Sequence, residues 1–149
     1  ASFLGSDQES SGWYSENGQV NWNNSAQYTA STYTTGDILS IAIDLDNNRL
    51  FYAKNGVWQN SGDPTSSTGA ITITGADTTN DGAYFICQAD DTGTSATSKF
   101  EFNFGNGYFG TTAVATNSGN GYQDADGNGI MNYSVPANYR CLCTKGLNQ

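Results

Sequence analysis

The clearest alternation of apolar and polar positions in this chain lies within residues 36–58 (GDILSIAIDLDNNRLFYAKNGVW). Apolar side chains stand at every second position of its first part: Leu39, Ile41, Ile43 and Leu45. This period of two predicts a half-buried β-strand. Residues 46–49 predict a reversal, because Asn tolerates the left-handed backbone of tight hairpin turns. Residues 50–52 predict the returning strand, and Asn55-Gly56 predicts a further turn.

Later segments of the chain also have the patterns of strands. Residues 70–74 (AITIT) alternate, and residues 83–89 form a short apolar run that predicts a buried strand. Residues 98–104 (SKFEFNF) carry Phe at every second position, and residues 133–142 lead into a final predicted strand. Polar loops rich in Gly, Asn and Thr separate these segments, which is typical of an all-β protein with short strands.

The N-terminal part predicts a second hairpin. Two aromatic clusters, residues 13–14 and residues 20–22, flank Asn17-Gly18, which is a strong turn signal. Tyr28 and Tyr33 follow in a segment rich in Thr and Ser, which could be a short edge strand or a loop.

Composition agrees with this interpretation. Hydrophobic residues make up 36% of the 149 positions and aromatic residues 13%, so Tyr and Phe replace much of the usual Leu and Ile in the core. Thr and aromatic residues favour strands, whereas Gly and Asn favour turns. The length is that of one ordinary domain with a real core, and no composition shift marks a second domain.

The charge excludes several classes of partner. The net charge is −9, and the five cationic residues are scattered along the sequence. Nucleic-acid binding needs clustered Lys and Arg, so neither nucleic acid nor an anionic membrane surface is an expected partner. Membrane insertion is not expected either, because no apolar run approaches the ~20 residues that span a bilayer.

The three cysteines predict little chemistry. Cys141 and Cys143 are two positions apart, a poor spacing for a disulfide between them, and Cys87 lies in an apolar run. We expect buried, reduced thiols, with a bridge from Cys87 to Cys141 or Cys143 as the alternative. A zinc site is not expected, since the chain has three thiols and no His.

Several of these motifs, taken together in their order, resemble the SPRY (B30.2-like) domain family. The matching motifs are residues 17–22 (NGQVNW), residues 36–37 (GD), residues 44–47 (DLDN), residues 54–56 (KNG) and residues 103–105 (NFG). The resemblance covers residues 3–110 and implies an antiparallel two-sheet β-sandwich of the jelly-roll, concanavalin-like type. It also implies a binding module rather than a catalyst.

The two ends of the chain refine this resemblance. Residues 136–144 (PANYRCLCT) look like the closing strand of SPRY-type structural proteins of phages and other viruses, where Ala is usual at the position of Cys141. Two or three strands of a full domain should lie upstream of Phe3. We therefore expect residues 1–149 to be a single SPRY-like domain that lacks its first strands, the larger C-terminal part of a full domain.

No arrangement of residues predicts catalysis. Ser-His-Asp and Cys-His sites are impossible within a chain without His. Glycosidases need two close carboxylates, and the three Glu residues (Glu9, Glu16 and Glu101) are far apart in the sequence. Glu101 is expected on the solvent face, opposite Phe100 and Phe102. We therefore expect that the chain is not an enzyme.

Residues 124–129 (DADGNG) match the first half of a calcium-binding EF-hand loop. Asp124, Asp126 and Asn128 supply oxygen at positions 1, 3 and 5, and Gly follows at position 6. Position 12 is Val135 instead of a bidentate Glu. Two interpretations remain open: a calcium site at these three residues, or an ordinary turn without a cofactor.

Aromatic side chains are the candidates for ligand binding. Rings offer large contact area at low entropic cost and stack on sugars. Trp22 and Trp58 match core positions of the family and are assigned to structure. The remaining candidates lie in loop-like segments, where surface exposure is expected: Trp13, Tyr14, Tyr28 and Tyr33. The alternative is that these rings fold back onto the sandwich.

The expected function is that of a non-enzymatic structural and recognition module in a virus particle. Such a module would be part of a capsid fibre, a decoration protein or a tail appendage of a phage. Its partners would be other virion proteins, further copies of itself as a homo-oligomer, or a glycan or protein on the host surface. The alternative is a lectin-like or peptide-binding domain of a larger cellular protein, with an extracellular or cytoplasmic location.

Overall fold

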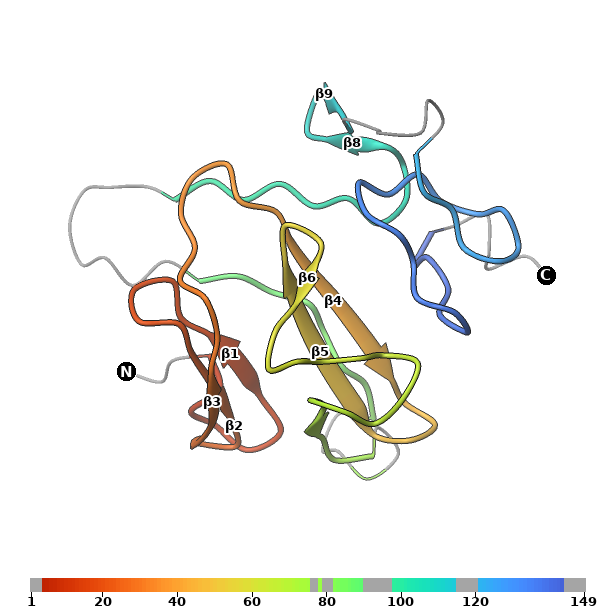
Figure 1. The fold of residues 1–149 in the computed structure, drawn as a ribbon. Helices are drawn as coiled ribbons and strands as arrows, with labels where there is room; N and C mark the ends of the chain where they lie inside the picture. Colours follow the sequence, from red (N-terminus) through yellow and green to blue (C-terminus); the bar gives the residue numbers. More distant parts are fainter. Residues whose placement is uncertain (1–3, 76–77, 79–81, 90–97, 115–120, 144–149) are drawn as a thin grey trace. The chain divides into compact units, whose positions relative to one another are not determined.

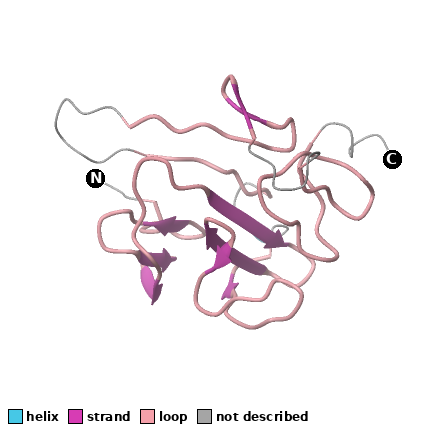
Figure 2. Cartoon of the chain, turned by 45° about the horizontal axis from the view of Figure 1, so that its top comes forward, coloured by secondary structure: helices cyan, strands magenta, loops and turns pink. Residues whose placement is uncertain are grey.

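The computed structural model describes residues 4–75, 78, 82–89, 98–114 and 121–143. In this part the chain is all-β, with antiparallel pairing and no α-helix, and Figure 2 shows short strands joined by loops. The predicted fold class is confirmed. The chain divides into two compact units, Ala1–Thr97 (unit 1) and Ser98–Gln149 (unit 2). A single domain over residues 1–149 stays a prediction.

The first sheet of unit 1 is a meander built around the predicted Asn17-Gly18 turn. Its strands are β1 (Ser11–Trp13), β2 (Gln19–Trp22) and β3 (Ser25–Thr29), in the order β1-β2-β3. Gly18 has a φ of 74°, and a Cβ there would collide with the carbonyl oxygen of Ala30. Glycine is therefore required at this turn both by its backbone conformation and by the lack of space.

The second sheet of unit 1 contains the predicted central hairpin. Its strands are β4 (Leu39–Asp44), β5 (Arg49–Lys54), β6 (Val57–Trp58) and β7 (Ile71–Thr72), and β5 pairs with the other three. The β4–β5 turn is closed by Asp44, whose carboxylate accepts the backbone N–H of Asn47 at 3.0 Å. Asn48 has a φ of 56°, which confirms that an Asn here adopts the left-handed backbone.

The two sheets of unit 1 enclose one hydrophobic core. Sheet β1-β2-β3 contributes Trp13, Val20 and Trp22, and the second sheet and the residues after it contribute Leu50, Ile71 and Ile73. A polar contact also joins the sheets, since the Tyr52 hydroxyl in β5 donates to the Ser11 hydroxyl in β1 at 3.0 Å. Figure 1 shows the sheets as two separate groups of arrows. Unit 1 is thus a two-layered antiparallel β arrangement, consistent with the predicted sandwich.

Unit 2 has little regular structure within its described residues. A two-stranded ribbon joins β8 (Tyr108–Phe109) to β9 (Thr112–Ala113), and Tyr122 and Met131 form an isolated bridge. The buried side chains are small or polar: Val114, Asp124, Asn128 and Cys141. Unit 2 therefore contains no large apolar cluster in its described part.

Three predicted strands are absent, over residues 83–89, 98–104 and 133–142. In the first of these, Phe85 is 79% exposed, so the prediction of a buried strand is wrong. The physical reason is that alternation predicts which face of a strand is apolar, whereas a strand also needs a neighbour for its backbone hydrogen bonds. No described residue pairs with these segments in that way.

The cysteines are all free. Cys141 is buried and Cys143 half-buried, whereas Cys87 is exposed, so its predicted burial is wrong. The wrong prediction for Cys87 follows from the wrong prediction of a buried strand over residues 83–89, because such a strand would have covered the thiol. Burial raises the pKa of the Cys141 thiol, and the nearby charge of Asp124 raises it further.

Candidate functional site

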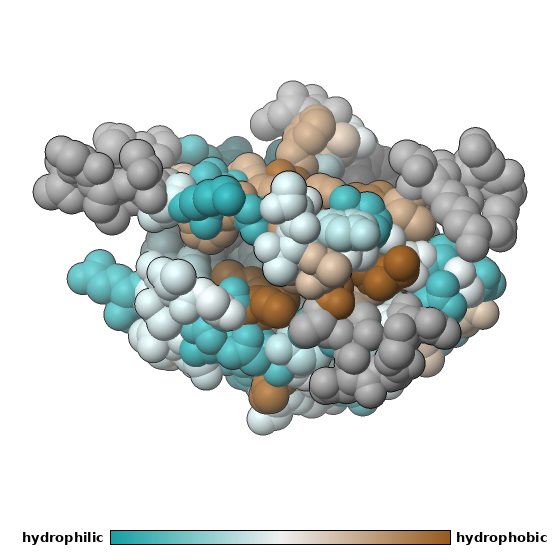
Figure 3. Space-filling view, turned by 90° about the horizontal axis from the view of Figure 1, so that it is seen from above, coloured by the Kyte–Doolittle hydropathy of each residue, from teal (hydrophilic) through white to brown (hydrophobic). Residues whose placement is uncertain are grey.

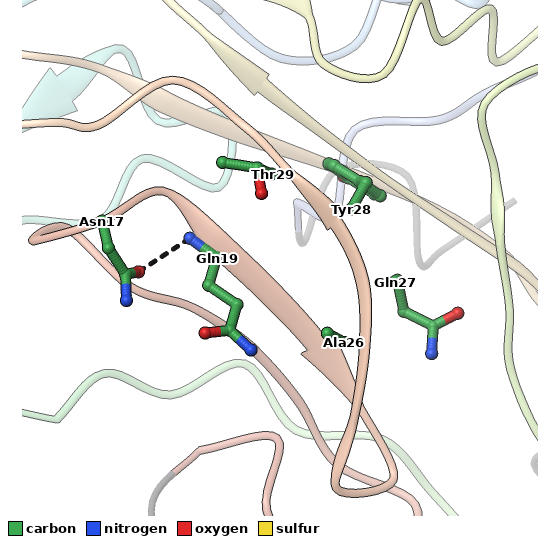
Figure 4. Close-up of a pocket in the computed structure, with 6 residues that line it drawn as sticks. All are labelled: Asn17, Gln19, Ala26, Gln27, Tyr28 and Thr29. Carbon is green, nitrogen blue, oxygen red and sulfur yellow. Dashed lines mark hydrogen bonds between the residues drawn. The ribbon is translucent and has the colours of Figure 1, made fainter.

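A shallow groove lies on sheet β1-β2-β3, with a cavity volume of about 300 Å³. It is lined by the β1–β2 turn, the start of β2 and most of β3, and Figure 4 shows its residues. We call it the amide groove, because three of its six residues carry side-chain amides: Asn17, Gln19, Ala26, Gln27, Tyr28 and Thr29.

The amide groove follows from the register of two strands. Val20 and Trp22 point into the core, so the residues that alternate with them in β2, Gln19 and Asn21, face outward. In β3, Thr29 lies opposite Gln19 and Ala26 lies opposite Asn21. The outer face of the sheet therefore combines polar side chains with one small residue.

A β-bulge opens the groove beside Gln27. The register shifts between Val20 and Asn21, which pair with Tyr28 and Ala26, so that Gln27 is the extra residue of β3. A bulge bends its strand and turns a side chain out of the regular alternation. The Gln27 amide donates to the Ser25 carbonyl at 3.1 Å, and its side chain is exposed to solvent.

Hydrogen bonds orient the other two amides. The Asn17 side-chain oxygen accepts the backbone N–H of Gln19 at 2.9 Å, as Figure 4 shows, and this bond fixes the turn. The Gln19 amide donates to the Asn21 side-chain oxygen at 2.9 Å. The Asn17 amide nitrogen and the Gln19 side-chain oxygen remain to interact with a ligand. The groove therefore offers both donors and acceptors.

The amide groove carries no charged side chain. Its one ionisable group is Tyr28, which lies opposite Val20 and so turns its ring toward the core. Burial raises the pKa of Tyr28 far above its ordinary value of 10.0, and the neighbouring Tyr52 raises it further. The phenol stays neutral at physiological pH, and the groove suits a neutral polar ligand better than an ion.

The predicted aromatic candidates do not form a common surface. Trp13 is in β1 and only 8% exposed, so the expected loop and surface position is wrong for this residue. Tyr33 packs edge-on against it at 5.3 Å between ring centroids and donates its hydroxyl to the Trp13 carbonyl at 2.8 Å. Tyr14 is half-buried and donates to the Leu4 carbonyl at 2.8 Å.

These contacts match the alternative in which the rings fold back onto the sandwich. Tyr28 borders the amide groove, but it lies in strand β3 and packs against the core. The structural assignment of Trp22 is confirmed by its 9% exposure, and Trp58 packs edge-on against Phe51 at 6.4 Å. Ligand contact by the four predicted residues stays a prediction.

The amide groups of the groove were not among the residues predicted to bind a ligand. The Asn17-Gly18 signal predicts a turn and no ligand contact, and no motif points to Gln19 or Gln27. The signal was present in residues 19–22 (QVNW), where amide and apolar side chains alternate. The contribution of Gln27 depends on the bulge, which no pattern in the sequence indicated.

The second predicted site, at residues 124–129, forms a tight turn in unit 2. Asp124 is 7% exposed, and one of its carboxylate oxygens accepts the backbone N–H groups of Asp126 and Asn128 at 3.1 and 2.8 Å. Its other oxygen accepts the N–H of Cys141 at 3.0 Å, seventeen residues away in the sequence. Asp124 thus closes its own turn and attaches a later segment to it.

Charge around the turn also differs from that of a calcium site. Arg140 forms an ion pair with Asp126, which places a guanidinium where a cation would bind. Burial raises the pKa of Asp124, but the hydrogen bonds from Asn128, Cys141 and Asp126 outweigh it and lower the pKa below 3.8. The carboxylate is therefore stabilised by N–H groups of the protein itself.

The residues present fit a turn better than a calcium site. In the described part of the chain, Asn128 is 2% exposed and its side-chain oxygen has no hydrogen-bond partner, so one oxygen is available to coordinate a cation. Across the same residues, no three Asp, Glu or Cys side chains are grouped as metal ligands would be. Calcium binding at Asp124, Asp126 and Asn128 stays a prediction, which calorimetric titration would check.

In the part of the chain that the structure describes, no helix has both the length and the apolar character needed to cross a membrane.

Comparison with known proteins identifies one family. No curated protein and no solved structure matches the chain. The family model of the SPRY domain matches residues 1–74, just under half of the chain. This segment contains both sheets of unit 1 and the six buried residues of their common core. The match supports the SPRY resemblance, so that residues 1–74 are identified as a SPRY-like segment.

Proposed function

We propose that this chain is a non-enzymatic binding module that recognises a protein partner through the amide groove. The SPRY match supports a protein-binding role in general. The observation that carries the proposal is the uncharged groove of about 300 Å³, which exposes amide groups on one face of a sheet. The other face of this sheet packs against the core of unit 1.

The chemistry of the groove suits main-chain and neutral polar groups of a partner. Each side-chain amide can donate and accept a hydrogen bond at once, as peptide groups and sugar hydroxyls also do. A hydrogen bond to Asn21 orients the Gln19 side chain, and a hydrogen bond from the backbone of the turn orients the Asn17 side chain. Less conformational entropy is therefore lost when a ligand binds. Glycan binding, as in a lectin-like domain, is the alternative with the same chemistry.

The finer proposal places this module in a virus particle. It is supported by residues 136–144, which resemble the ending of SPRY-type viral structural proteins, and by an acidic chain with polar loops. The module would then be part of a capsid fibre, decoration protein or tail appendage. Its partners would be other virion proteins, further copies of itself or a host-surface molecule. Mass spectrometry of purified particles from the source would test this placement.

Peptide and glycan arrays test the binding role itself. We expect reproducible binding to peptides that falls about tenfold in Gln19→Ala and Gln27→Ala variants, the effect of losing about 1.4 kcal/mol. Gln8→Ala is the matched control, because Gln8 is also an exposed Gln but lies outside the groove. Binding should be unchanged in this control.

Other array results would change the proposal. Binding to glycans alone, with the same dependence on Gln19 and Gln27, would replace the protein partner by a sugar. Absence of binding on both arrays would contradict the binding role. Binding that survives both substitutions would show that the amide groove is not the contact surface.

A further inference from the structure

Within the described residues, one edge of strand β4 has no strand partner, and the apolar face of this strand is incompletely covered. Among the described residues it pairs with β5 alone. Ile41 lies opposite Tyr52 and Ile43 opposite Leu50, so both isoleucines share the face of the sheet that carries the core. Even so, Ile41 is 43% exposed and Ile43 36% exposed. Apolar side chains also reach the surface on the face of the molecule that Figure 3 shows, in brown.

Such an edge favours the addition of a further strand. Its N–H and C=O groups can pair with another extended segment, and side chains of that segment would cover the exposed isoleucines. The added segment must alternate with the period of a strand, apolar toward Ile41 and Ile43 and polar on the other face.

Residues 98–104 have this pattern and are not in a strand themselves. Phe100, Phe102 and Phe104 are 40%, 45% and 41% exposed. The rings of Phe102 and Phe104 stack with their planes 3° apart and their centroids 5.8 Å apart, so they lie on the same side of the segment. The segment thus has an alternating apolar side of the kind that would cover Ile41 and Ile43 of β4.

Charge selects one direction of pairing. In an antiparallel register with Phe102 opposite Ile41, Phe100 lies opposite Ile43 and Lys99 opposite Asp44. A parallel register with Phe100 opposite Ile41 places Asn103 opposite Asp44 and Lys99 opposite Ser40, so no opposite charges face each other across the pair. Opposite charges across a strand pair are stabilising. Lys99 has an 82% exposed side chain and an ion pair with Glu101, which solvent exposure makes weak.

We propose that two copies of this chain associate by strand exchange, in which residues 98–104 of each copy pair antiparallel with β4 of the other. The contact is the same in both directions, so it gives a closed two-fold dimer. This inference does not depend on the proposed function, because the amide groove lies on the other sheet of unit 1.

The apolar surface involved is of the size that a dimer needs. An aromatic side chain buries about 150–250 Å² in full, so a ring that is about 40% exposed has roughly 60–100 Å² left to bury. Three Phe side chains and two Ile side chains in each copy give on the order of 600–900 Å² per dimer. Backbone pairing and flanking side chains add to this and bring the interface to the ~1,200 Å² of specific complexes.

Mass in solution tests the exchange. We expect light scattering after size-exclusion chromatography to give twice the chain mass at high concentration. Phe102→Ser should weaken the dimer at least tenfold, because the buried ring is lost from both contacts. Phe85→Ser is the matched control, since Phe85 is exposed but lies outside the two paired segments. Its dimer should be as stable as that of the unmodified chain.

The predicted register has its own tests. A carbodiimide links a carboxylate to an amine only when the two are in contact, and we expect a Lys99–Asp44 cross-link. In a mixture of ¹⁴N- and ¹⁵N-labelled chains, that cross-link should join peptides of different label. Lys99→Glu should weaken the dimer severalfold, and adding Asp44→Lys should restore part of the loss.

Several outcomes would overturn the proposal. One is a monomer at every concentration. Others are a dimer that Phe102→Ser and Lys99→Glu leave intact, or Lys99–Asp44 cross-links confined to peptides of one label. Lys99→Glu keeps a charged, exposed side chain, so it should fold normally. The cross-link is measured on the unmodified chain and needs no variant.

Discussion

Unit 1 and unit 2 are each stabilised internally by a different kind of interaction. In unit 1, Trp13, Val20 and Ile71 pack between two sheets, and large apolar side chains account for the core. In the described part of unit 2, the buried side chains are small or polar, and side-chain hydrogen bonds join segments that are distant in the sequence.

Among the described residues of unit 2, Asp124 and Asn103 illustrate such contacts. Asp124 accepts the N–H of Cys141 at 3.0 Å, and Asn103 donates to the Ile130 carbonyl at 2.9 Å. Asn103 also accepts the N–H of Gly105 at 2.8 Å. Buried area stabilises unit 1 without regard to direction, whereas each bond in unit 2 depends on one donor and one acceptor. The same kind of substitution should therefore have different effects in the two units.

The largest effect is expected from Trp13→Ala in unit 1. The substitution removes a ring that contacts Tyr33 and Tyr52 and leaves a cavity in the core. We expect the free energy of unfolding to fall by about 3–5 kcal/mol, as for other buried Trp or Phe residues. Urea unfolding followed by circular dichroism would measure it.

Phe85→Ala is the control, because it removes a similar ring from a position that is 79% exposed. It should change the free energy of unfolding by no more than about 0.5 kcal/mol. A larger loss for Phe85→Ala than for Trp13→Ala would contradict the assignment of the core to the two sheets of unit 1.

The part of the fold that could be predicted is the part in which strands and the turn between them lie close together in the sequence. Residues 36–58 contain both the strands and the turns that join them, so pattern and turn chemistry together predicted the hairpin β4–β5. Residues 83–89 and 98–104 have the pattern of strands, but no short turn signal such as Asn-Gly joins either of them directly to a second strand pattern. Their pairing depends on distant segments, which periodicity does not reveal.

The candidate site could be predicted only in part. The Asn17-Gly18 turn and the inward positions of Val20 and Trp22 follow from the sequence, and they place Gln19 on the outer face. The groove beside it depends on the bulge at Gln27, a shift of one residue in a pairing. Trp13 was expected at the surface because three residues of β1 are too short a segment to show alternation.

An intermediate effect is expected from Asp124→Asn in unit 2. The Asn side chain presents N–H where the carboxylate oxygen accepted the N–H of Cys141, so two donors would face each other. We expect a loss of about 1–3 kcal/mol, the usual cost of leaving a buried polar group unpaired. Hydrogen exchange at the Cys141 amide would measure it, and Asp126→Asn is the control, because Asp126 is exposed.

The same bond should respond to pH. The pKa of Asp124 is lower in the folded chain than its ordinary value, so its contribution is fully present above about pH 4. The contribution is lost as the pH falls through the lowered pKa of the folded state and the carboxyl becomes protonated. Protection of the Cys141 amide, corrected for intrinsic exchange, should therefore fall below pH 4. In Asp124→Asn this pH dependence should disappear; a profile unchanged by the substitution would assign it to another group.

The smallest effect is expected from a polar contact in unit 1. Lys54 donates to the Thr32 carbonyl at 2.7 Å and lies 3.0 Å from the Asp37 carboxylate, with a side chain 24% exposed. Lys54→Met keeps the length of the side chain and removes its charge. Because exposed ion pairs contribute about 0.2–1 kcal/mol, urea unfolding should detect a loss of no more than about 1 kcal/mol. A loss as large as that of Trp13→Ala would mean that unit 1, like unit 2, depends on single polar contacts, and the contrast between the units would fail.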